Sequence, residues 1–250
     1  MNLHHMDSVS PPFVVDQEPI AWNNGNNQAP SGLELLTNAK KVLISQQVRW
    51  KDICSACTGC EVEKKYTIHG ENGDAILWAS ETSGCGMRMC CGNDRSLQIG
   101  LTDFKSQEVF NLDRPLNCSG CCCSCCYPSC TQAMTVSMNG LPIGTIRERA
   151  TWVYPVLHIF DPVDQQIMKV RGPCCPISCG GDVEFFVTDT EGREIASIVK
   201  KWTGCAKEMI EADNFSVEFK VDLGVKEKAV IVGAAFLIDF LHYEENNQNH

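Results

Sequence analysis

Apolar and polar residues alternate along several short stretches of this 250-residue chain. The alternation is clearest in residues 215–221, with Phe215, Val217, Phe219 and Val221 on one side and Ser216, Glu218 and Lys220 on the other. A period of two residues is that of a half-buried β-strand. The pattern therefore predicts a strand here, shortly before the most apolar stretch of the chain.

That stretch runs from Ala229 to Leu241, and a single charge, Asp239, interrupts it. A helix without a polar face must be buried in protein or in lipid. A helix of this length spans roughly 20 Å, whereas a hydrocarbon core is about 30 Å thick. An ionised Asp239 inside lipid would also cost at least ~2.5 kcal/mol. We therefore predict that the run is the core helix of a soluble domain, and a membrane-inserted helix is the alternative.

Ten further stretches upstream carry strand patterns, separated by turn residues. The strongest turn signal is Asn139-Gly140, which joins Met134–Met138 to Ile143–Arg147. A twelfth strand is expected around Val48–Ile53, and Leu33–Gln47 is predicted to be a short helix with Leu36, Leu43 and Ile44 inward. The remaining strand candidates are Tyr66–His69, Ala75–Ala79, Leu97–Phe104, Val109–Leu112, Val156–Phe160, Gln166–Arg171, Asp182–Thr188 and Arg193–Lys200.

Many evenly spaced short strands and one apolar helix predict a mainly β fold, a closed antiparallel barrel with the helix threaded through it. Residues 1–31 contain Pro11-Pro12 and an Asn/Gly-rich run, which predicts a disordered N-terminal segment. We expect the barrel domain to cover residues 32–244 and residues 245–250 to form a polar tail.

The formal net charge is −10, and no block of Lys or Arg offsets it. Nucleic acid is therefore not expected as the main partner. The same charge opposes docking on an anionic leaflet unless a divalent cation or a lipid anchor helps. The sequence contains no HExxH, P-loop or nucleophile–base motif that would indicate covalent catalysis, so we do not expect an enzyme.

The chain has 17 cysteines, an odd number, and its first ten residues lack the apolar region of a signal peptide. We therefore expect a cytosolic protein with reduced thiols. S-acylation is one interpretation of the densest cluster, and each buried methylene of an acyl chain contributes roughly 0.8 kcal/mol to membrane binding. Metal binding is an alternative, because Cys54, Cys57 and Cys60 have chelating spacing, as do Cys118 and Cys121. A third interpretation is that these cysteines are reduced thiols in loops and have no special role. The predicted acylation sites are Cys121, Cys122, Cys123, Cys125 and Cys126.

Five segments in a specific order resemble the phospholipid scramblase family from about Gly32 to Glu244. They are Leu112–Leu116 (LDRPL), Cys118–Cys130 (CSGCCCSCCYPSC), Gly180–Val183 (GGDV), Lys201–Gly204 (KWTG) and Glu211–Glu244. The family is related to tubby-like proteins, so the resemblance implies a twelve-stranded barrel around a central helix. It also implies calcium-dependent, ATP-independent, bidirectional movement of phospholipids between leaflets, by a protein S-acylated at the cytoplasmic face of the plasma membrane. The family's Pro-rich N-terminal ligands are missing here, so docking to SH3 or WW domains is not expected.

The resemblance also implies a Ca²⁺ segment, an EF-hand-like loop over Glu211–Asp222. Its ligand places fall on Glu211, Asp213, Phe215, Val217, Phe219 and Asp222. Phe215 replaces an oxygen ligand and Ser216 replaces the turn glycine, so the match to an EF-hand is poor. A weak Ca²⁺ site at the strand ends and a plain barrel strand both remain open.

Lys200, Lys201 and Trp202 align with part of a nuclear-import segment of some family members, although a lysine pair at a strand end is commonly just solvated. Two functions of different classes follow. The first is a Ca²⁺-triggered scramblase that acts on membrane phospholipids, with a homo-oligomer as one way to build a path. The second is a palmitoylated, tubby-like lipid-binding adaptor that signals at the membrane, or in the nucleus when it is not acylated.

Overall fold

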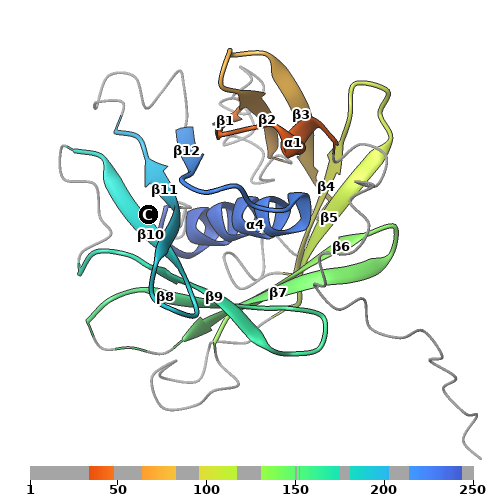
Figure 1. Ribbon diagram of the computed structural model, residues 1–250. Coiled ribbons are helices and arrows are strands. Elements are labelled where there is room, and N and C mark those ends of the chain that lie inside the picture. Colours follow the sequence, from red (N-terminus) through yellow and green to blue (C-terminus); the bar gives the residue numbers. More distant parts are fainter. Residues whose placement is uncertain are drawn as a thin grey trace, which may run out of the picture.

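The computed structural model describes residues 34–47, 64–82, 96–116, 131–149, 151, 153–174, 181–202 and 214–243. In this part of the chain, twelve antiparallel strands close a barrel around the long helix α4 (Val225–His242), as Figure 1 shows. A short helix, α1 (Glu34–Thr37), precedes the first strand. The strands are β1 (Lys41–Gln46), β2 (Lys65–Gly70), β3 (Ala75–Glu81), β4 (Leu97–Thr102), β5 (Glu108–Arg114), β6 (Ala133–Met138), β7 (Leu141–Arg149), β8 (Val156–Phe160), β9 (Gln166–Arg171), β10 (Val183–Asp189), β11 (Glu194–Lys200) and β12 (Asn214–Phe219).

Each strand pairs with its neighbours in the sequence, and β1 pairs with β12 to close the barrel. The closing register places Val42 opposite Val217 and Ile44 opposite Phe215. The predicted closed antiparallel barrel with a central helix is therefore confirmed. Eleven strands lie where the alternation predicted them, with ends that differ by a few residues.

The predicted helix over Leu33–Gln47 is wrong for most of its length. Of the described residues in this range, only Glu34–Thr37 is helical, and Lys41–Gln46 is the first strand of the barrel. Val42 and Ile44 point inward, whereas Leu43 is half-buried between them. Pairing with β2 and β12 decides the conformation here, because tertiary context overrides local propensity. The strand expected around Val48–Ile53 lies outside the described residues.

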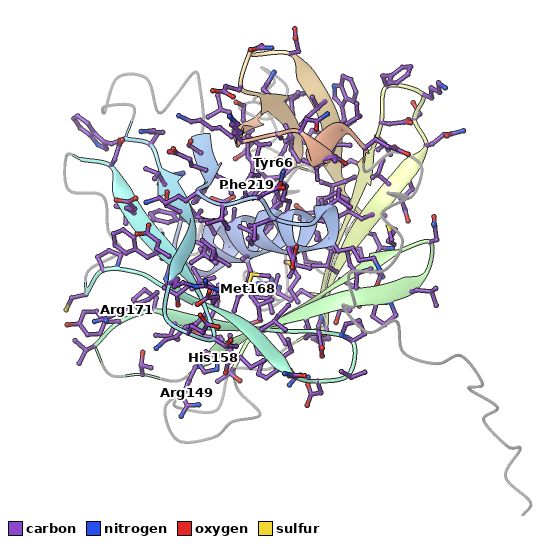
Figure 2. The ribbon with its side chains drawn as sticks, viewed as in Figure 1. Tyr66, Arg149, His158, Met168, Arg171 and Phe219 are labelled. Carbon is purple, nitrogen blue, oxygen red and sulfur yellow. The ribbon has the colours of Figure 1, made fainter. Side chains whose placement is uncertain are left out.

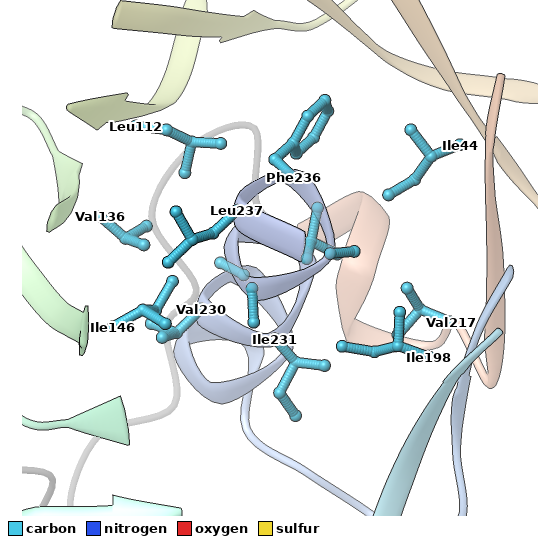
Figure 3. Packing of buried hydrophobic residues seen from close by; sticks show 14 of the residues in the cluster. Ile44, Leu112, Val136, Ile146, Ile198, Val217, Val230, Ile231, Phe236 and Leu237 are labelled. Carbon is cyan, nitrogen blue, oxygen red and sulfur yellow. The ribbon is translucent and has the colours of Figure 1, made fainter. Parts of the chain in front are cut away.

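The core lies between the inward side chains of the strands and all sides of α4. From Ala229 to Phe240 every residue of the helix is buried. Figure 3 shows Leu112, Val136 and Ile146 beside Leu237 and Val230, with Ile198 and Val217 on the other side of the helix. A helix with apolar residues all round is satisfied because strands surround it. Within the described residues, no helix combines the length and the apolar character needed to cross a bilayer.

Two glycines allow α4 to approach the sheet closely. A Cβ atom on Gly144 of β7 would lie 2.8 Å from Val230 Cγ2 and 3.2 Å from the Phe160 carbonyl oxygen. A Cβ atom on Gly233 of the helix would lie 2.9 Å from Val136 Cγ2. The helix therefore rests on β6 and β7 at a distance that a larger residue at either position would disturb.

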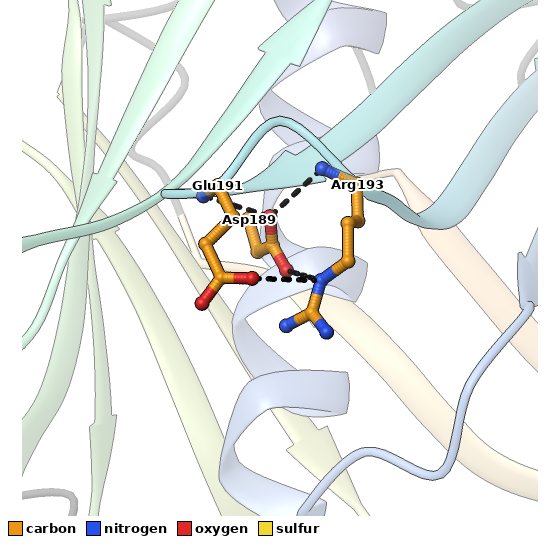
Figure 4. A network of polar contacts seen from close by, with 3 residues as sticks. All are labelled: Asp189, Glu191 and Arg193. Carbon is orange, nitrogen blue, oxygen red and sulfur yellow. Dashed lines mark hydrogen bonds and ion pairs between the residues drawn. The ribbon is translucent and has the colours of Figure 1, made fainter.

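Three hairpins are closed by the same five-residue turn. In each, the first residue is an aspartate whose Oδ1 accepts the backbone N–H groups of the third and fifth residues, at 2.8–3.0 Å. The fourth residue has positive φ in all three: Ser106, Asp164 and Gly192. The aspartates are Asp103, Asp161 and Asp189, and Figure 4 shows the third turn, in which Arg193 also pairs with Asp189 and Glu191.

The two rims of the barrel differ. Because neighbouring strands are antiparallel, the odd-numbered strands all end at one rim, and short turns connect the strands at the other. We call the first the cysteine rim and define it by Gln46, Glu81, Arg114, Arg149, Arg171 and Lys200, the last residues of the odd-numbered strands. All 17 cysteines fall in sequence between an odd-numbered strand and the next even-numbered one. Every cysteine-bearing segment therefore joins the barrel at this rim.

Candidate functional site

Charged and polar side chains gather around the C-terminal end of α4, at the cysteine rim. The Tyr66 hydroxyl donates to Asp239 Oδ2 at 3.3 Å. The guanidinium of Arg114 lies over the Phe240 ring, 5.5 Å from its centre. The ammonium of Lys200 lies 5.0 Å from the ring centre of Tyr243. Asp239, Arg114 and Lys200 are all buried. The two cations are placed favourably, because a helix C-terminus carries a partial negative charge.

The last helical residue, His242, is half-buried in the same region. Its imidazole stacks on Phe185, with 6.3 Å between the ring centres and 19° between the planes. Burial lowers the pKa of His242, because the charged imidazolium loses its hydration there. This end of the barrel therefore favours the neutral form of the ring.

The predicted acylation sites lie outside the described residues, as do the Cys54–Cys60 group and Cys118. Of the cysteines, the structure describes Cys174, which is exposed and free. Among the described residues, no group of three or more His, Cys, Asp or Glu side chains is placed to hold a metal ion. Acylation and metal binding by the cysteine segments both stay predictions. The flanking strand β5 ends at Arg114, so the cluster that follows it leaves from the cysteine rim.

The predicted Ca²⁺ segment is divided between a strand and its two flanks. Phe215, Val217 and Phe219 belong to β12, and their side chains are buried in the core. Their backbones pair with β1 on one side and β11 on the other. Apolar side chains supply no oxygen to a hard cation, so these three places do not fit a Ca²⁺ shell.

The acidic members of that segment lie beyond the two ends of β12. Asp222 is exposed in the link to α4, at the rim opposite the cysteines. Glu211 and Asp213 precede the strand and lie outside the described residues. Six residues of strand span about 20 Å, so Asp222 and the start of β12 are too far apart to share one ion. Ca²⁺ binding stays a prediction that concerns Glu211, Asp213 and Asp222.

Lys228, one turn into α4, ties the helix to α1. Its ammonium donates to the carbonyl oxygens of Leu36, Thr37 and Ala39 at 3.2, 2.7 and 3.0 Å. Burial lowers the pKa of Lys228, and the nearby Asp222 carboxylate partly opposes that effect. This clamp holds the N-terminal half of the helix in the barrel.

The predicted import segment is engaged in the fold. Lys200 is 5% exposed, and its ammonium lies 4.8 Å from the Phe215 ring centre. Lys201 Nζ pairs with Asp182 Oδ2 at 2.6 Å. The Trp202 N–H donates to the same carboxylate, and these two hydrogen bonds hold the pKa of Asp182 below its ordinary value. Trp202 itself is exposed. Nuclear import stays a prediction, and an import receptor would have to release Lys200 from the barrel.

A group of basic residues on the outer face of β7–β9 was not predicted from the sequence. Arg149, His158, Lys169 and Arg171 come from three neighbouring strands, and Figure 2 shows three of them on one side of the barrel. The sequence signal that could have indicated this group is the strand alternation, which has a period of two residues. In these three strands, the residues that alternate with the buried core positions are unusually often basic. They do not form a continuous run of charges in the sequence.

Comparison with known proteins places the whole barrel in one family. The family model described as Scramblase matches residues 21–245. Phospholipid scramblase 1 of Homo sapiens is 38% identical over 220 residues, which cover 86% of this chain and 66% of the relative. Phospholipid scramblase 2 of Bos taurus is 36% identical over 86% of this chain and 72% of the relative. Phospholipid scramblase family member 5 of Homo sapiens is 34% identical over 87% of this chain and 79% of the relative.

The chain spans about two thirds of the length of the first of these relatives. No solved structure gives a significant match. The family model covers far more than half of the chain, and the barrel and the helix both lie inside it. The chain therefore belongs to the scramblase family.

Proposed function

We propose that this protein moves phospholipids in both directions between the leaflets of a membrane, without ATP and in response to Ca²⁺. The observation that carries the proposal is the match of residues 21–245 to the Scramblase family, together with relatives named phospholipid scramblases at 31–38% identity. Such transport needs no covalent chemistry. Membrane phospholipids are then both the partners and the cargo.

We further propose the cytoplasmic face of the plasma membrane as the location. S-acyl chains on Cys121, Cys122, Cys123, Cys125 and Cys126 would anchor the protein there. The support is topological, because the segment with these cysteines connects β5 to β6 at the cysteine rim. Acylation would therefore turn this rim toward the bilayer. Two or more chains hold a protein stably on a membrane, whereas one chain does so only marginally.

The filled barrel favours a second candidate function. The interior of the described barrel is occupied by α4 and by apolar side chains, so a lipid headgroup has no polar path through a single copy. This observation supports an acylated lipid-binding adaptor without its own transport activity. A transporter would instead need an oligomer or a path along the outside of the barrel.

Purified protein in liposomes separates the two. A fluorescent lipid in the inner leaflet becomes accessible to a membrane-impermeant quencher only if lipids cross. We expect faster quenching with protein and Ca²⁺ than in protein-free liposomes. Membrane binding without any gain in lipid crossing would reject the transport function and leave the adaptor.

The Ca²⁺ response has its own test. We expect weak binding, about 10⁻⁴–10⁻³ M, since few carboxylates are present and the turn glycine is missing. Because Asp222 is too far from the start of β12 to share one ion with Asp213, only the substitution at the end that binds Ca²⁺, either Asp213→Ala or Asp222→Ala, should abolish the Ca²⁺-dependent gain in liposome binding or lipid crossing. Asp74→Ala removes an exposed carboxylate from a different hairpin and serves as the matched control. Calorimetry on all four proteins, with phosphatidylserine vesicles, measures it. Equal responses in all four would show that this segment is only a strand.

A further inference from the structure

The outer face of β7, β8 and β9 carries two rows of side chains that run across the strands. In the row at the cysteine rim, Arg149 lies opposite Val156, and Val156 lies opposite Arg171. In the next row, Arg147 lies opposite His158, and His158 lies opposite Lys169. Side chains directly opposite each other are about 5 Å apart at Cβ, and diagonal neighbours about 7–8 Å. Four cations and one imidazole therefore share a small area of the barrel surface.

Within the described residues, most of this positive charge has no carboxylate partner. Arg147 pairs with Asp164 at 2.6 Å. In the described part of the chain, no ion pair involves Arg149, Lys169 or Arg171, and all three are exposed. Glu184 of β10 shares this outer face as an exposed acid. Three unpaired cations in one place are notable in a chain whose net charge is −10.

Aromatic and apolar side chains border the cations. The Arg171 guanidinium lies over the Tyr154 ring, 4.2 Å from its centre. Val153 and Phe186 are 51% and 43% exposed, and Phe186 lies opposite Arg171 on β10. Cations beside exposed aromatic and apolar groups suit a membrane interface, where the charge meets phosphate and the apolar atoms meet the acyl boundary. The same row ends at the cysteine rim, because Arg149 and Arg171 are the last residues of their strands.

We propose that the outer face formed by Arg149, His158, Lys169 and Arg171 binds the phosphate groups of an anionic membrane surface. It would seat the barrel with its cysteine rim beside the bilayer. The inference rests on the proposed function only in taking a membrane as the source of the phosphate. The exposed apolar neighbours favour lipid over nucleic acid as the polyanion, because a membrane surface also accepts apolar side chains.

His158 provides a readout at the centre of this face. Burial lowers the pKa of His158 and is the largest effect. The positive charges of Arg149 and Lys169 lower the pKa further, whereas a hydrogen bond with Gln166 raises it. Arg147 faces it from β7, but that charge is paired with Asp164. A phosphate bound among these cations would stabilise the imidazolium. The pKa of His158 should therefore rise when the face is occupied.

The test measures sedimentation of the full chain, produced without acylation, with vesicles in Ca²⁺-free buffer. The triple variant Arg149→Gln, Lys169→Gln and Arg171→Gln should bind phosphatidylserine-containing vesicles about 100-fold more weakly, at about fivefold per cation. The matched control is Lys40→Gln, Lys41→Gln and Lys105→Gln, which removes the same charge from exposed positions elsewhere. Control and wild type should bind alike, and wild-type binding should fall with added salt. Equal binding by the two triple variants, with thermal unfolding showing both folded, would overturn the proposal.

Three further arms separate the sources of phosphate. Phosphatidylcholine vesicles and inorganic phosphate should bind the wild-type face weakly, and a single-stranded oligonucleotide should not compete with anionic vesicles. Effective competition by either soluble anion would overturn a membrane-specific role. In wild-type protein, NMR titration should show a higher pKa for His158 with a soluble short-chain phosphatidylserine, and an unchanged pKa would also count against it. These measurements do not involve lipid crossing. The proposed transport can therefore be rejected while binding by this face is supported, and binding by this face can be rejected while transport is supported.

Discussion

At the scale of single residues, the barrel places ionisable groups where their charge must be matched locally. Lys228 donates to three carbonyl oxygens, and Tyr66 donates to Asp239. These contacts compensate for the free-energy cost of desolvating a buried charge or dipole. His242 differs, since its principal neighbours are aromatic rings, so its environment favours the neutral ring.

His242 predicts a loss of stability on acidification. Its pKa in the folded protein lies below the ordinary value near 6.5. Between these two pKa values, the unfolded chain binds more protons than the folded chain. The contribution to stability is therefore complete above about pH 6.5 and is lost as the pH falls through the folded pKa. Urea unfolding at pH 7.5 and 5.5 measures the change in the free energy of unfolding.

The variant His242→Phe should reduce that pH dependence while it keeps the stacking on Phe185. His158 also has a lowered pKa and acts in the same direction, so His158→Gln serves as the comparison and should remove a separate share. An unchanged difference between the two pH values in His242→Phe would refute the role of His242.

At the scale of elements, α4 and the strands are stable only together. The helix has no face that could meet water, and the inward residues of the strands have no core without it. Close contact at Gly144 and Gly233 fixes the helix against β6 and β7. The repeated aspartate turns close three of the hairpins that surround it.

Phe236 tests this packing. Its ring is 1% exposed and meets the Tyr66 ring edge-on, with 5.0 Å between the centres. Phe236→Ala should lower the free energy of unfolding by about 3–5 kcal/mol, because it opens a cavity between the helix and the strands. Phe104→Ala, at a side chain that is 70% exposed, should change it by less than ~0.5 kcal/mol. Similar losses in both variants would contradict an enclosed helix.

The aspartate turns give a second prediction at this scale. Asp161→Ala removes the acceptor of the Val163 and Gln165 N–H groups, which lie 3.0 and 2.8 Å from Oδ1. We expect a loss of about 1–3 kcal/mol in the free energy of unfolding, since Asp161 is buried and water replaces the bonds poorly. Asp161→Asn keeps an oxygen in place and should retain most of the stability. Thermal or urea unfolding of the pair measures it, and equal losses would show that charge rather than the two bonds matters.

At the scale of the whole molecule, the barrel separates its two rims chemically. One rim carries short turns, and the other receives every cysteine-bearing segment and the C-terminal end of α4. The unpaired cations of Arg149 and Arg171 lie at the end of their strands on that same rim. Acyl chains, cations and exposed aromatic groups would then act on the membrane from one side of the protein.

Membrane attachment should therefore depend on the predicted acylation cluster. Replacing Cys121, Cys122, Cys123, Cys125 and Cys126 with Ser should move the protein from the membrane pellet to the supernatant of cell fractions, because the acyl chains supply most of the binding energy. Hydroxylamine, which cleaves thioesters, should have the same effect on wild type. The exposed Cys174→Ser variant is the control and should stay in the pellet. Full retention of the quintuple variant in the pellet would place the anchor elsewhere.

The sequence by itself determined the elements whose character is local. Alternation in residues 215–221 and the Asn139-Gly140 turn predicted strands and a hairpin, and the apolar run of Ala229–Leu241 predicted an enclosed helix. These signals are readable because period and turn chemistry depend on neighbouring residues alone.

Only the tertiary structure decided which distant residues meet. Lys41–Gln46 is a strand because β2 and β12 flank it, and Lys228 is satisfied by carbonyl groups about 190 positions earlier in the chain. The basic face exists because three strands place Arg149, His158 and Lys169 side by side, although each strand alone carries at most two cations. Barrel closure fixes these neighbours through register, and register depends on the pairing of whole strands rather than on any one segment.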